Sequence, residues 1–453
     1  MMDASHHIAD HVLTLRWTDI PASTRAMAAT FLHDSLCVGI AGAHAPYAHA
    51  VQAAVRGWSG AHGGCGLLGR AERLPPCDAA FVNAFQIHAQ EYDCVHEPAV
   101  VHPLATIVAV LLAELDRGPR RSGAELLLAI IAGVDVAAGL GLAATTPLRF
   151  FRPATAGIFG SVAALAVLRG SSYDVTRDAL GYALAFAAGT MQAHVEGKPA
   201  LPVQIAQAAR SAIQAIDLAQ AGLPGSRDTI EGPYGYMPLF EAGSDVSRMR
   251  LGDGFRIDEV SWKPFPTGRA AHGAIVATQT LMRDHGVTAE TLQRLEYRAP
   301  SLIQRLVGRS PAADMGPAYA RLCFPWLASV VLTRGTIALD DFDDDRRHDA
   351  ALLALAGKIT VTADDNPDPA AFTPAVATAH LTDGSVHRVA VTAQLGSPAW
   401  PLGREQHLAK ARGCLAFAGL EELHDPLVAA IAALAETADA GATLNAVLRR
   451  PIR

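Results

Sequence analysis

Long apolar segments rich in alanine, leucine and valine dominate the chain from residue 7 to about residue 240. They end at glycine or proline, as in ATIVAVLLAEL, SVAALAVLRG and QAARSAIQAIDLAQAG. Their periodicity and these stop signals predict helices. Because such helices are apolar nearly all round, they must pack on one another. The sequence therefore predicts a large α-helical bundle.

The most apolar segment, residues 125–144, is about long enough to span a bilayer. Asp135 lies at its middle and several small residues dilute its hydrophobicity, so we interpret it as a buried helix. Ser122 and Glu125 have the spacing of a capping box, which predicts that this helix begins there.

A change of pattern near Val260 predicts a second lobe. Short strand-like segments (RLEYRA, KITVTA, ATAHL and HRVAVTA) then alternate with helix-like ones. The Asp-Gly pair in LTDGS, residues 381–385, indicates a hairpin, so an antiparallel sheet is expected. Helical segments return after SPAWPLG. We predict a mostly α fold: a large α-helical bundle domain formed by both chain ends (1–260 and 398–453), with an inserted smaller α+β lid domain (261–397).

Composition narrows the possible partners. Of 453 residues, 50% are hydrophobic and 18% charged, so the chain can bury a large core. The net charge is −7 and there is no block of Lys and Arg, which argues against nucleic acid or an anionic membrane as the binding partner and favours a small molecule. The six cysteines form no CxxC pair and the first residues show no secretory signal, so reduced thiols and a cytoplasmic location are expected. Gly64, Gly66 and Gly69 match GxGxxG, but prolines follow too soon for a dinucleotide site, and a glycine turn is expected.

The segment NAFQIHAQEYDCVHEPAVVHPLAT, residues 83–106, concentrates histidines and acids. If the helix persists, His88, Tyr92 and His96 share a face, with Asp93 to one side and His102 beyond. The histidines have three interpretations. They are polar groups on the bundle surface, or metal ligands together with Glu91, or acid/base groups. No standard metal spacing is present, so no metal is expected, and acid/base chemistry is favoured.

Lysine usage singles out one further residue. The chain holds four lysines against 33 arginines, and Lys263 stands between Trp262 and Pro264 where the pattern changes. A lysine at this place suggests a need for a compact or titratable cation, although an ordinary surface lysine is the alternative.

These features together resemble the MmgE/PrpD family, which contains 2-methylcitrate dehydratases, cis-aconitate decarboxylases and an iminodisuccinate epimerase. The matching segments, in order, are FLHDSLCVGIAGA, AAFVNAFQIHAQEYDCVHEPAVVHPLAT, FRPATAGIFGSVAALAVLRG, AQAGLPGSRDTIEGPYGY, SWKPFPTGRAAHGAI and AYARLCFPWLASVVLTRG. The resemblance implies a homodimer and a metal-free, cofactor-independent pocket between the two domains. It places the family's active-site aspartate on Asp93, the histidine of its HP motif on His102 and the lysine of its KPxP motif on Lys263.

Two family positions differ. Arg152 stands where many members have a histidine, and Leu201 and Gln204 stand where many have the lysine and histidine of KPLH. Replacing the histidine by Arg152 removes a candidate acid but keeps a cation. This weakens the dehydratase and decarboxylase assignments and raises the epimerase-like one.

The shared chemistry is removal of a proton or carboxylate next to a carboxylate, which needs a base and fixed cations. We expect Asp93 or His102 to take the proton, and Lys263 to hold a substrate carboxylate together with Arg152 and Arg269. The residues expected to contact substrate are His96, Arg152, Gln204, Arg269 and Tyr319, and His96, His102 or Tyr319 remain candidate acids. His194 and Arg321 are weaker candidates, because a lone polar residue beside apolar helices is more often solvated or capped.

The sequence hypothesis is thus an enzyme that abstracts a proton alpha to a carboxylate of a small di- or tricarboxylate, with a 2-methylcitrate-dehydratase-like lyase first. The alternatives are an epimerase or isomerase of an aminodicarboxylate such as iminodisuccinate, a cis-aconitate-type decarboxylase, or a binding protein without catalysis.

Overall fold

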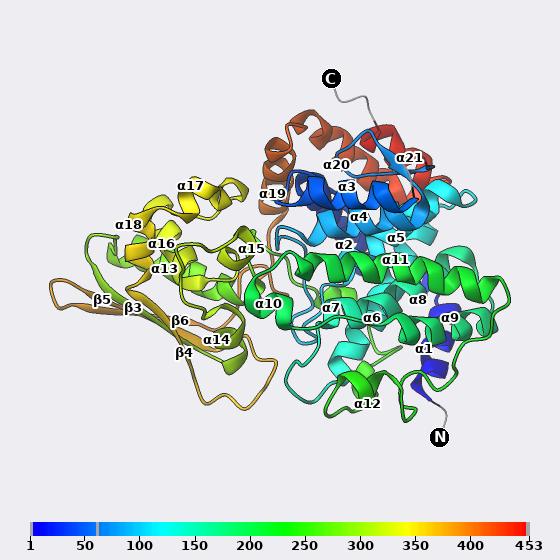
Figure 1. The fold of residues 1–453 in the computed structure, drawn as a ribbon, viewed down its shortest axis with the longest axis horizontal. Coiled ribbons are helices and arrows are strands. Elements are labelled where there is room, and N and C mark those ends of the chain that lie inside the picture. Colours follow the sequence, from blue (N-terminus) through cyan, green and yellow to red (C-terminus); the bar gives the residue numbers. More distant parts are fainter. Residues whose placement is uncertain (1–2, 60–62, 450–453) are drawn as a thin grey trace.

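The computed structural model describes residues 3–59 and 63–449. It shows a large helical body and a smaller lobe that carries a sheet, side by side along the long axis (Figure 1). The helices of the first part of the chain are α1 (Ala4–Thr14), α2 (Ala22–Gly42), α3 (Ala48–Ser59), α4 (Pro76–His88), α5 (Pro103–Arg117), α6 (Gly123–Ala143), α7 (Arg152–Thr155), α8 (Gly157–Arg169), α9 (Tyr173–Phe186), α10 (Gln192–Glu196), α11 (Ala200–Gln220) and α12 (Tyr236–Phe240).

Helix α6 lies in the core of the helical body, as its sequence predicts. It begins with the expected capping box, in which Ser122 and Glu125 satisfy each other's backbone N–H groups. Its length and composition alone would suit a membrane span, but 89% of the apolar window is buried inside the protein. Asp135 is paired there with His11, whose Nε2 is 3.0 Å from the carboxylate. The interpretation as a buried helix is confirmed.

Small residues let α6 and α8 approach closely. A Cβ added to Gly133 would lie 2.8 Å from the carbonyl oxygen of Gly160, and one added to Gly160 would lie 2.6 Å from the carbonyl oxygen of Gly133. Any larger side chain at either position would force the two backbones apart. The glycines that dilute the hydrophobicity of this segment therefore serve helix packing.

The smaller lobe has its own hydrophobic core, and the change of core falls between Trp262 and Phe265. Its helices are α13 (His272–His285), α14 (Ser301–Val307), α15 (Pro317–Ala320), α16 (Phe324–Arg334), α17 (Asp344–Arg347) and α18 (Ala350–Ala356). Its strands are β3 (Leu292–Ala299), β4 (Ile359–Ala363), β5 (Ala375–Leu381) and β6 (Val386–Val391). Helices α13 and α16 pack against this sheet.

The sheet has the order β4-β3-β5-β6 and is mixed. The predicted hairpin joins β5 to β6, and Gly384 takes the positive φ of +88° that its turn requires. The expectation of an antiparallel sheet is wrong for one pair, because β3 and β4 are parallel. The helices from α14 to α18 connect β3 to β4 and return the chain to the end of the sheet at which β3 begins, so β4 runs in the same direction as β3.

The chain then returns to the helical body through α19 (Arg404–Phe417), α20 (His424–Ala433) and α21 (Ala440–Leu448). Helices α19 and α20 pack on α2, and α21 packs on α5 (Figure 1). The mostly α fold with a body built from both chain ends is confirmed. The Gly64–Gly69 segment forms a short ladder, β1 (Cys65–Gly66) with β2 (Arg73–Leu74), and a turn, as expected, rather than a strand that leads into a helix.

Candidate active site

The candidate site is built on the loop between α4 and α5. Helix α4 ends at His88, so the helical face proposed for His88, Tyr92 and His96 does not form. His102 occupies the N-cap position of α5, directly before Pro103. Because helix geometry stops at His88, the loop can fold back and bring Asp93 between the two ends of the helices.

Two backbone pairings hold this loop in shape. Val95 exchanges hydrogen bonds with Ser261 across the lobe junction, at 3.1 and 2.8 Å, and His96 exchanges them with Val101. Within the loop Glu91 and Val100 take positive φ values of +50° and +52°. A left-handed conformation is unfavourable for a β-branched residue, and such strain is typical of functional sites. The loop is therefore tightly constrained, and it is tied to the segment that carries Lys263.

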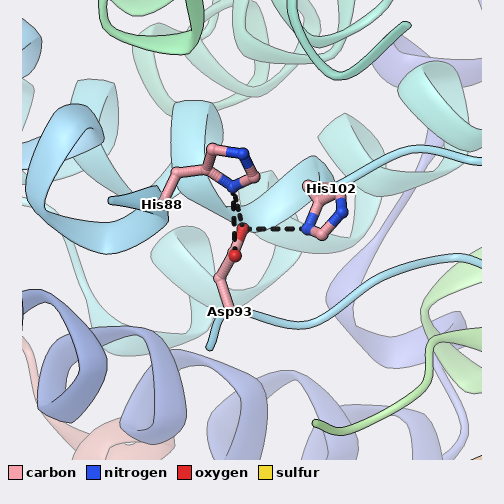
Figure 2. Close-up of side chains that lie close together, drawn as sticks. All are labelled: His88, Asp93 and His102. Carbon is pink, nitrogen blue, oxygen red and sulfur yellow. Dashed lines mark hydrogen bonds and ion pairs between the residues drawn. The ribbon is translucent and has the colours of Figure 1, made fainter. Parts of the chain in front are cut away.

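Asp93 lies between two imidazoles (Figure 2). Its carboxylate oxygens are both 3.1 Å from Nδ1 of His88, and one is 3.2 Å from Nδ1 of His102. Burial alone would raise the pKa of Asp93, but the two imidazoles lower it well below its usual range. A charged Asp93 requires N–H on Nδ1 of each ring, so Nε2 of His102 is the nitrogen left to exchange a proton.

The two histidines are held in different charge states. Burial lowers the pKa of His88, but Asp93 and Glu91 outweigh it and raise that pKa above its usual value. Burial, together with the Lys263 ammonium, lowers the pKa of His102 despite Asp93. These pKa shifts favour the protonated form of His88, the ionised form of Asp93 and the neutral form of His102. A neutral imidazole is in the right form to act as a base.

Lys263 is completely buried and is joined to this cluster through Glu91. Its Nζ is 2.8 Å from Oε2 of Glu91 and 3.1 Å from the Glu91 carbonyl oxygen. The other carboxylate oxygen of Glu91 lies 3.6 Å from Nε2 of His88. Burial raises the pKa of Glu91, but Lys263 and the histidines lower it to about 2. The chain of contacts from Lys263 through Glu91 and His88 to Asp93 makes one connected network.

A cavity of about 60 Å³ lies beside this network, between the two lobes. It has room for a few water-sized groups. Its titratable lining residues are Glu91, His102, His194 and Arg269, and the remaining ones are apolar or glycine: Val95, Val100, Leu148, Phe151, Pro153, Met191, Gly268, Ala270, Leu306, Val307, Leu322 and Phe372. His102 and Glu91 thus connect the network to a mainly apolar space.

Arg269 is the cation that lines the cavity. Its Nε donates to Glu97 at 2.7 Å, and its Nη1 donates to the carbonyl oxygens of Trp262 and Leu395 at 3.0 and 2.7 Å. Its Nη2 is buried and has no hydrogen-bond partner among the described residues. A buried unsatisfied donor is unfavourable, so the N–H groups of this nitrogen remain free to donate to an anionic oxygen that comes within reach.

The other residues predicted to contact substrate are engaged elsewhere. Arg152 is buried and makes a two-pronged ion pair with Glu241, at 2.7 and 2.8 Å. Nε2 of His96 lies 3.1 Å from Glu259 and Nδ1 accepts from the backbone N–H of Ala99. Gln204 accepts a hydrogen bond from the backbone N–H of Thr190 and donates one to its carbonyl oxygen. The Tyr319 hydroxyl donates to the carbonyl oxygen of Ser310 at 2.8 Å.

The two weaker candidates, His194 and Arg321, lie beside different cavities. His194 lines the cavity, and burial, with help from nearby Arg309, lowers its pKa to about 4. Arg321 is buried against a separate small hollow beside α4 and α11, with its guanidinium over the Phe342 ring. Of the predicted set, the structure thus gathers Asp93, His102, Lys263 and Arg269, with His194.

Sequence reasoning missed the acids that accompany the cations. It considered Glu91 only as a metal ligand, and it did not consider Glu97 or Glu241. A signal existed in principle, because a buried lysine or arginine needs a partner charge. The positions of those partners come only from the fold.

The cluster also has atoms that a metal ion could use. Ligand atoms of His88, Asp93 and His102 all lie within 4.8 Å of one another, the one such group found among the described residues. The 3.1 and 3.2 Å separations are those of N–H···O hydrogen bonds, so the three side chains already satisfy one another.

Comparison with known protein families matches two models: the MmgE/PrpD N-terminal domain over residues 6–249 and the MmgE/PrpD C-terminal domain over residues 265–429. The chain belongs to the MmgE/PrpD family. A cis-aconitate decarboxylase of Homo sapiens is 30% identical over 63% of this chain, and that of Mus musculus is 30% identical over 65%. The chain spans about three fifths of these two relatives, 61% and 62% of their lengths. A cis-aconitate decarboxylase-like protein of Aspergillus oryzae is 26% identical over 78% of both chains. MmgE/PrpD membership and these relatives support a lyase-type enzyme.

Proposed function

We propose that this protein is a lyase that removes a proton from the carbon next to a carboxylate of a small carboxylic acid. The observation that carries the proposal is the His102 imidazole, held by Asp93 at the wall of a cavity that the Arg269 side chain also lines. A base and an anion anchor facing one small space are what this reaction needs.

Each group has a role that follows from its contacts. Arg269 would bind the substrate carboxylate and orient the adjacent carbon. His102 Nε2 would accept the proton, and Asp93 would stabilise the imidazolium through Nδ1. Lys263, paired with Glu91, stands behind this group, and His88 holds Asp93 from its other side. The apolar walls strengthen all of these charge interactions by excluding water.

Elimination of water completes the reaction that we place first. After taking the proton, the His102 imidazolium can give it to a hydroxyl that leaves from the neighbouring carbon, so a new C=C bond forms and water departs. One group then serves as base and acid in turn.

Decarboxylation is the second candidate, favoured by the names of the three relatives. In that reaction the C–C bond to a carboxylate breaks, and the carbon left behind must receive a proton. His102 would have to start in its protonated form, which its lowered pKa disfavours at neutral pH. Elimination should therefore persist above pH 7, whereas decarboxylation should fall as the pH rises.

The test is incubation with a panel of small carboxylic acids in D₂O. Ultraviolet absorbance detects a new C=C bond, evolved CO₂ detects decarboxylation, and mass spectrometry detects deuterium in recovered acid. Deuterium entering an acid or its epimer without either product would support the isomerase alternative. If wild type and His102→Gln treat every acid alike, the proposal is wrong.

A further inference from the structure

A second imidazole lies at the wall of the cavity that His102 lines. His194 stands in α10 and lines this cavity together with Met191, which directly precedes that helix. Within the described chain no hydrogen bond reaches Nε2 of His194, and this atom is not one of the fully buried polar atoms that lack a partner. Nε2 of His194 therefore keeps accessible surface that a small molecule can contact.

Arg309 determines which nitrogen of His194 carries the proton. Nη2 of Arg309 lies 3.4 Å from Nδ1 of His194, and it donates to the carbonyl oxygens of His194 and Leu306 at 3.0 and 3.3 Å. A guanidinium has only donors, so Nδ1 must face it with a lone pair. The proton of the neutral ring is then on Nε2, which points away from Arg309 because the two nitrogens lie on opposite sides of the ring.

The surroundings of His194 also keep its ring neutral. Burial is the main cause that lowers its pKa to about 4, and Arg309 lowers it further. Glu91 acts in the opposite direction, while Arg305 and His102 act in the same direction as Arg309. At neutral pH the ring therefore carries a single proton, and its contact with Arg309 places that proton on Nε2.

The two histidines of the cavity wall thus have opposite tautomers. Asp93 accepts the Nδ1 proton of His102, which leaves a lone pair on Nε2 of that ring. Arg309 occupies the Nδ1 lone pair of His194, which leaves an N–H on Nε2 of the other ring. One cavity therefore has a proton acceptor and a hydrogen-bond donor, each fixed by a charged partner behind it.

We propose that His194 is a further catalytic residue, whose Nε2–H donates a hydrogen bond to the substrate carboxylate as negative charge builds on it. The inference rests on the proposed function for the proton-abstraction step. In that step the C–H bond breaks, its proton goes to Nε2 of His102, and its electron pair spreads onto the oxygens of the adjacent carboxylate. His194 keeps its own proton and stabilises this charge, and the apolar walls strengthen the hydrogen bond.

Nuclear magnetic resonance of the whole protein, with histidine labelled by ¹⁵N, tests the assignment without turnover. At neutral pH the nitrogen shifts should place the His194 proton on Nε2 and the His102 proton on Nδ1. Addition of tricarballylate, an unreactive tricarboxylate, should move the His194 Nε2 resonance, and Arg309→Met should give a mixture of the two His194 tautomers. A wild-type proton on Nδ1 of His194, or an Nε2 resonance that tricarballylate leaves in place, would overturn the inference.

Two substitutions separate a hydrogen-bond donor from a side chain that only fills space. On an acid that the enzyme turns over, His194→Leu should lower kcat by about 10²–10³ with a smaller change in KM, the usual effect of losing one such donor. His194→Gln keeps an N–H near the place of Nε2 and should recover most of that loss. A glutamine variant no more active than the leucine variant would contradict the donor role.

His380→Leu is the matched control. Nε2 of His380 lies 3.0 Å from an arginine nitrogen, that of Arg294, but His380 stands in β5 and does not line the cavity. This variant should leave kcat unchanged, and a loss equal to that of His194→Leu would also overturn the inference.

The two proposals can fail separately. If the tautomers are as assigned and tricarballylate moves the His194 resonance but no acid turns over, the donor assignment stands and the lyase proposal fails. If an acid turns over and His194→Leu matches the wild type, the lyase proposal stands and the role of His194 fails.

Discussion

Replacing Lys263 by methionine should destabilise the protein strongly. The ammonium is fully buried and Glu91 is its ion-pair partner, so the variant leaves a carboxylate in an apolar surrounding with only histidines nearby. The pKa of Glu91 is lowered from 4.5 to about 2, which corresponds to about 3 kcal/mol of stabilisation of its charged form. Breaking a buried pair from one side typically costs about 3–5 kcal/mol. We expect the free energy of unfolding of Lys263→Met to fall by an amount in this range.

Urea unfolding at neutral pH, monitored by circular dichroism, measures the free energy of unfolding of the wild type, of Lys263→Met and of a double variant. In Lys263→Met with Glu91→Gln no unpaired charge remains, so most of the lost stability should return while the enzymatic activity stays low. The wild-type contribution of Glu91 is present above pH 4.5 and is lost as the pH falls toward 2. A loss below about 1 kcal/mol in the single variant, or a double variant no more stable than it, would refute the buried-pair reasoning.

Three further changes test the site and the fold. Asp93→Asn removes the charge that holds His102. On an acid that the enzyme turns over, kcat should therefore fall by about 10²–10⁴ with a smaller change in KM, and an unchanged kcat would show that Asp93 does not support the base. Burial lowers the pKa of three histidines, His33, His194 and His407, to about 4. As the pH falls from 6.5 to 4 the unfolded state takes up these protons first, so the free energy of unfolding should fall by on the order of 3 kcal/mol for each histidine. Urea midpoints measured across that pH range test this. Gly42→Ala would place a Cβ 1.9 Å from the carbonyl oxygen of Gln86 and should lower the free energy of unfolding by about 1–3 kcal/mol or more. The control Gly413→Ala has open space around it and should be neutral or stabilise the protein by up to about 1 kcal/mol. Equal melting temperatures for the two variants would contradict this packing.

Features that depend on neighbours in sequence were predictable. The capping box of Ser122 and Glu125 and the turn at Gly384 follow from contacts within four residues, and the structure contains both. The helical body was predictable because its apolar segments leave few other ways to exclude water. The parallel pairing of β3 with β4 was not, because it depends on the path of a connection of nearly sixty residues.

The candidate site was predictable only in part, for the same reason. Asp93 and His102 stand nine residues apart, and the resemblance placed both in one segment. The partner of Lys263 lies 172 residues away, and that of Arg152 lies 89 residues away. No local pattern specifies such pairs, so free cations were expected where the fold supplies neutralised ones.

The two hydrogen bonds between Val95 and Ser261 have a mechanical consequence. They fasten the loop that carries Asp93 to the first residues of the segment that crosses between the lobes, so residues 93–102 and 261–263 should move as one unit. If the smaller lobe swings to admit a ligand, its pivot has to lie beyond Lys263 in the chain. The proton-transfer groups would then keep their mutual geometry, with Arg269 bound to Glu97 and Trp262, while the opposite wall, with Leu306 and Phe372, moves away from them.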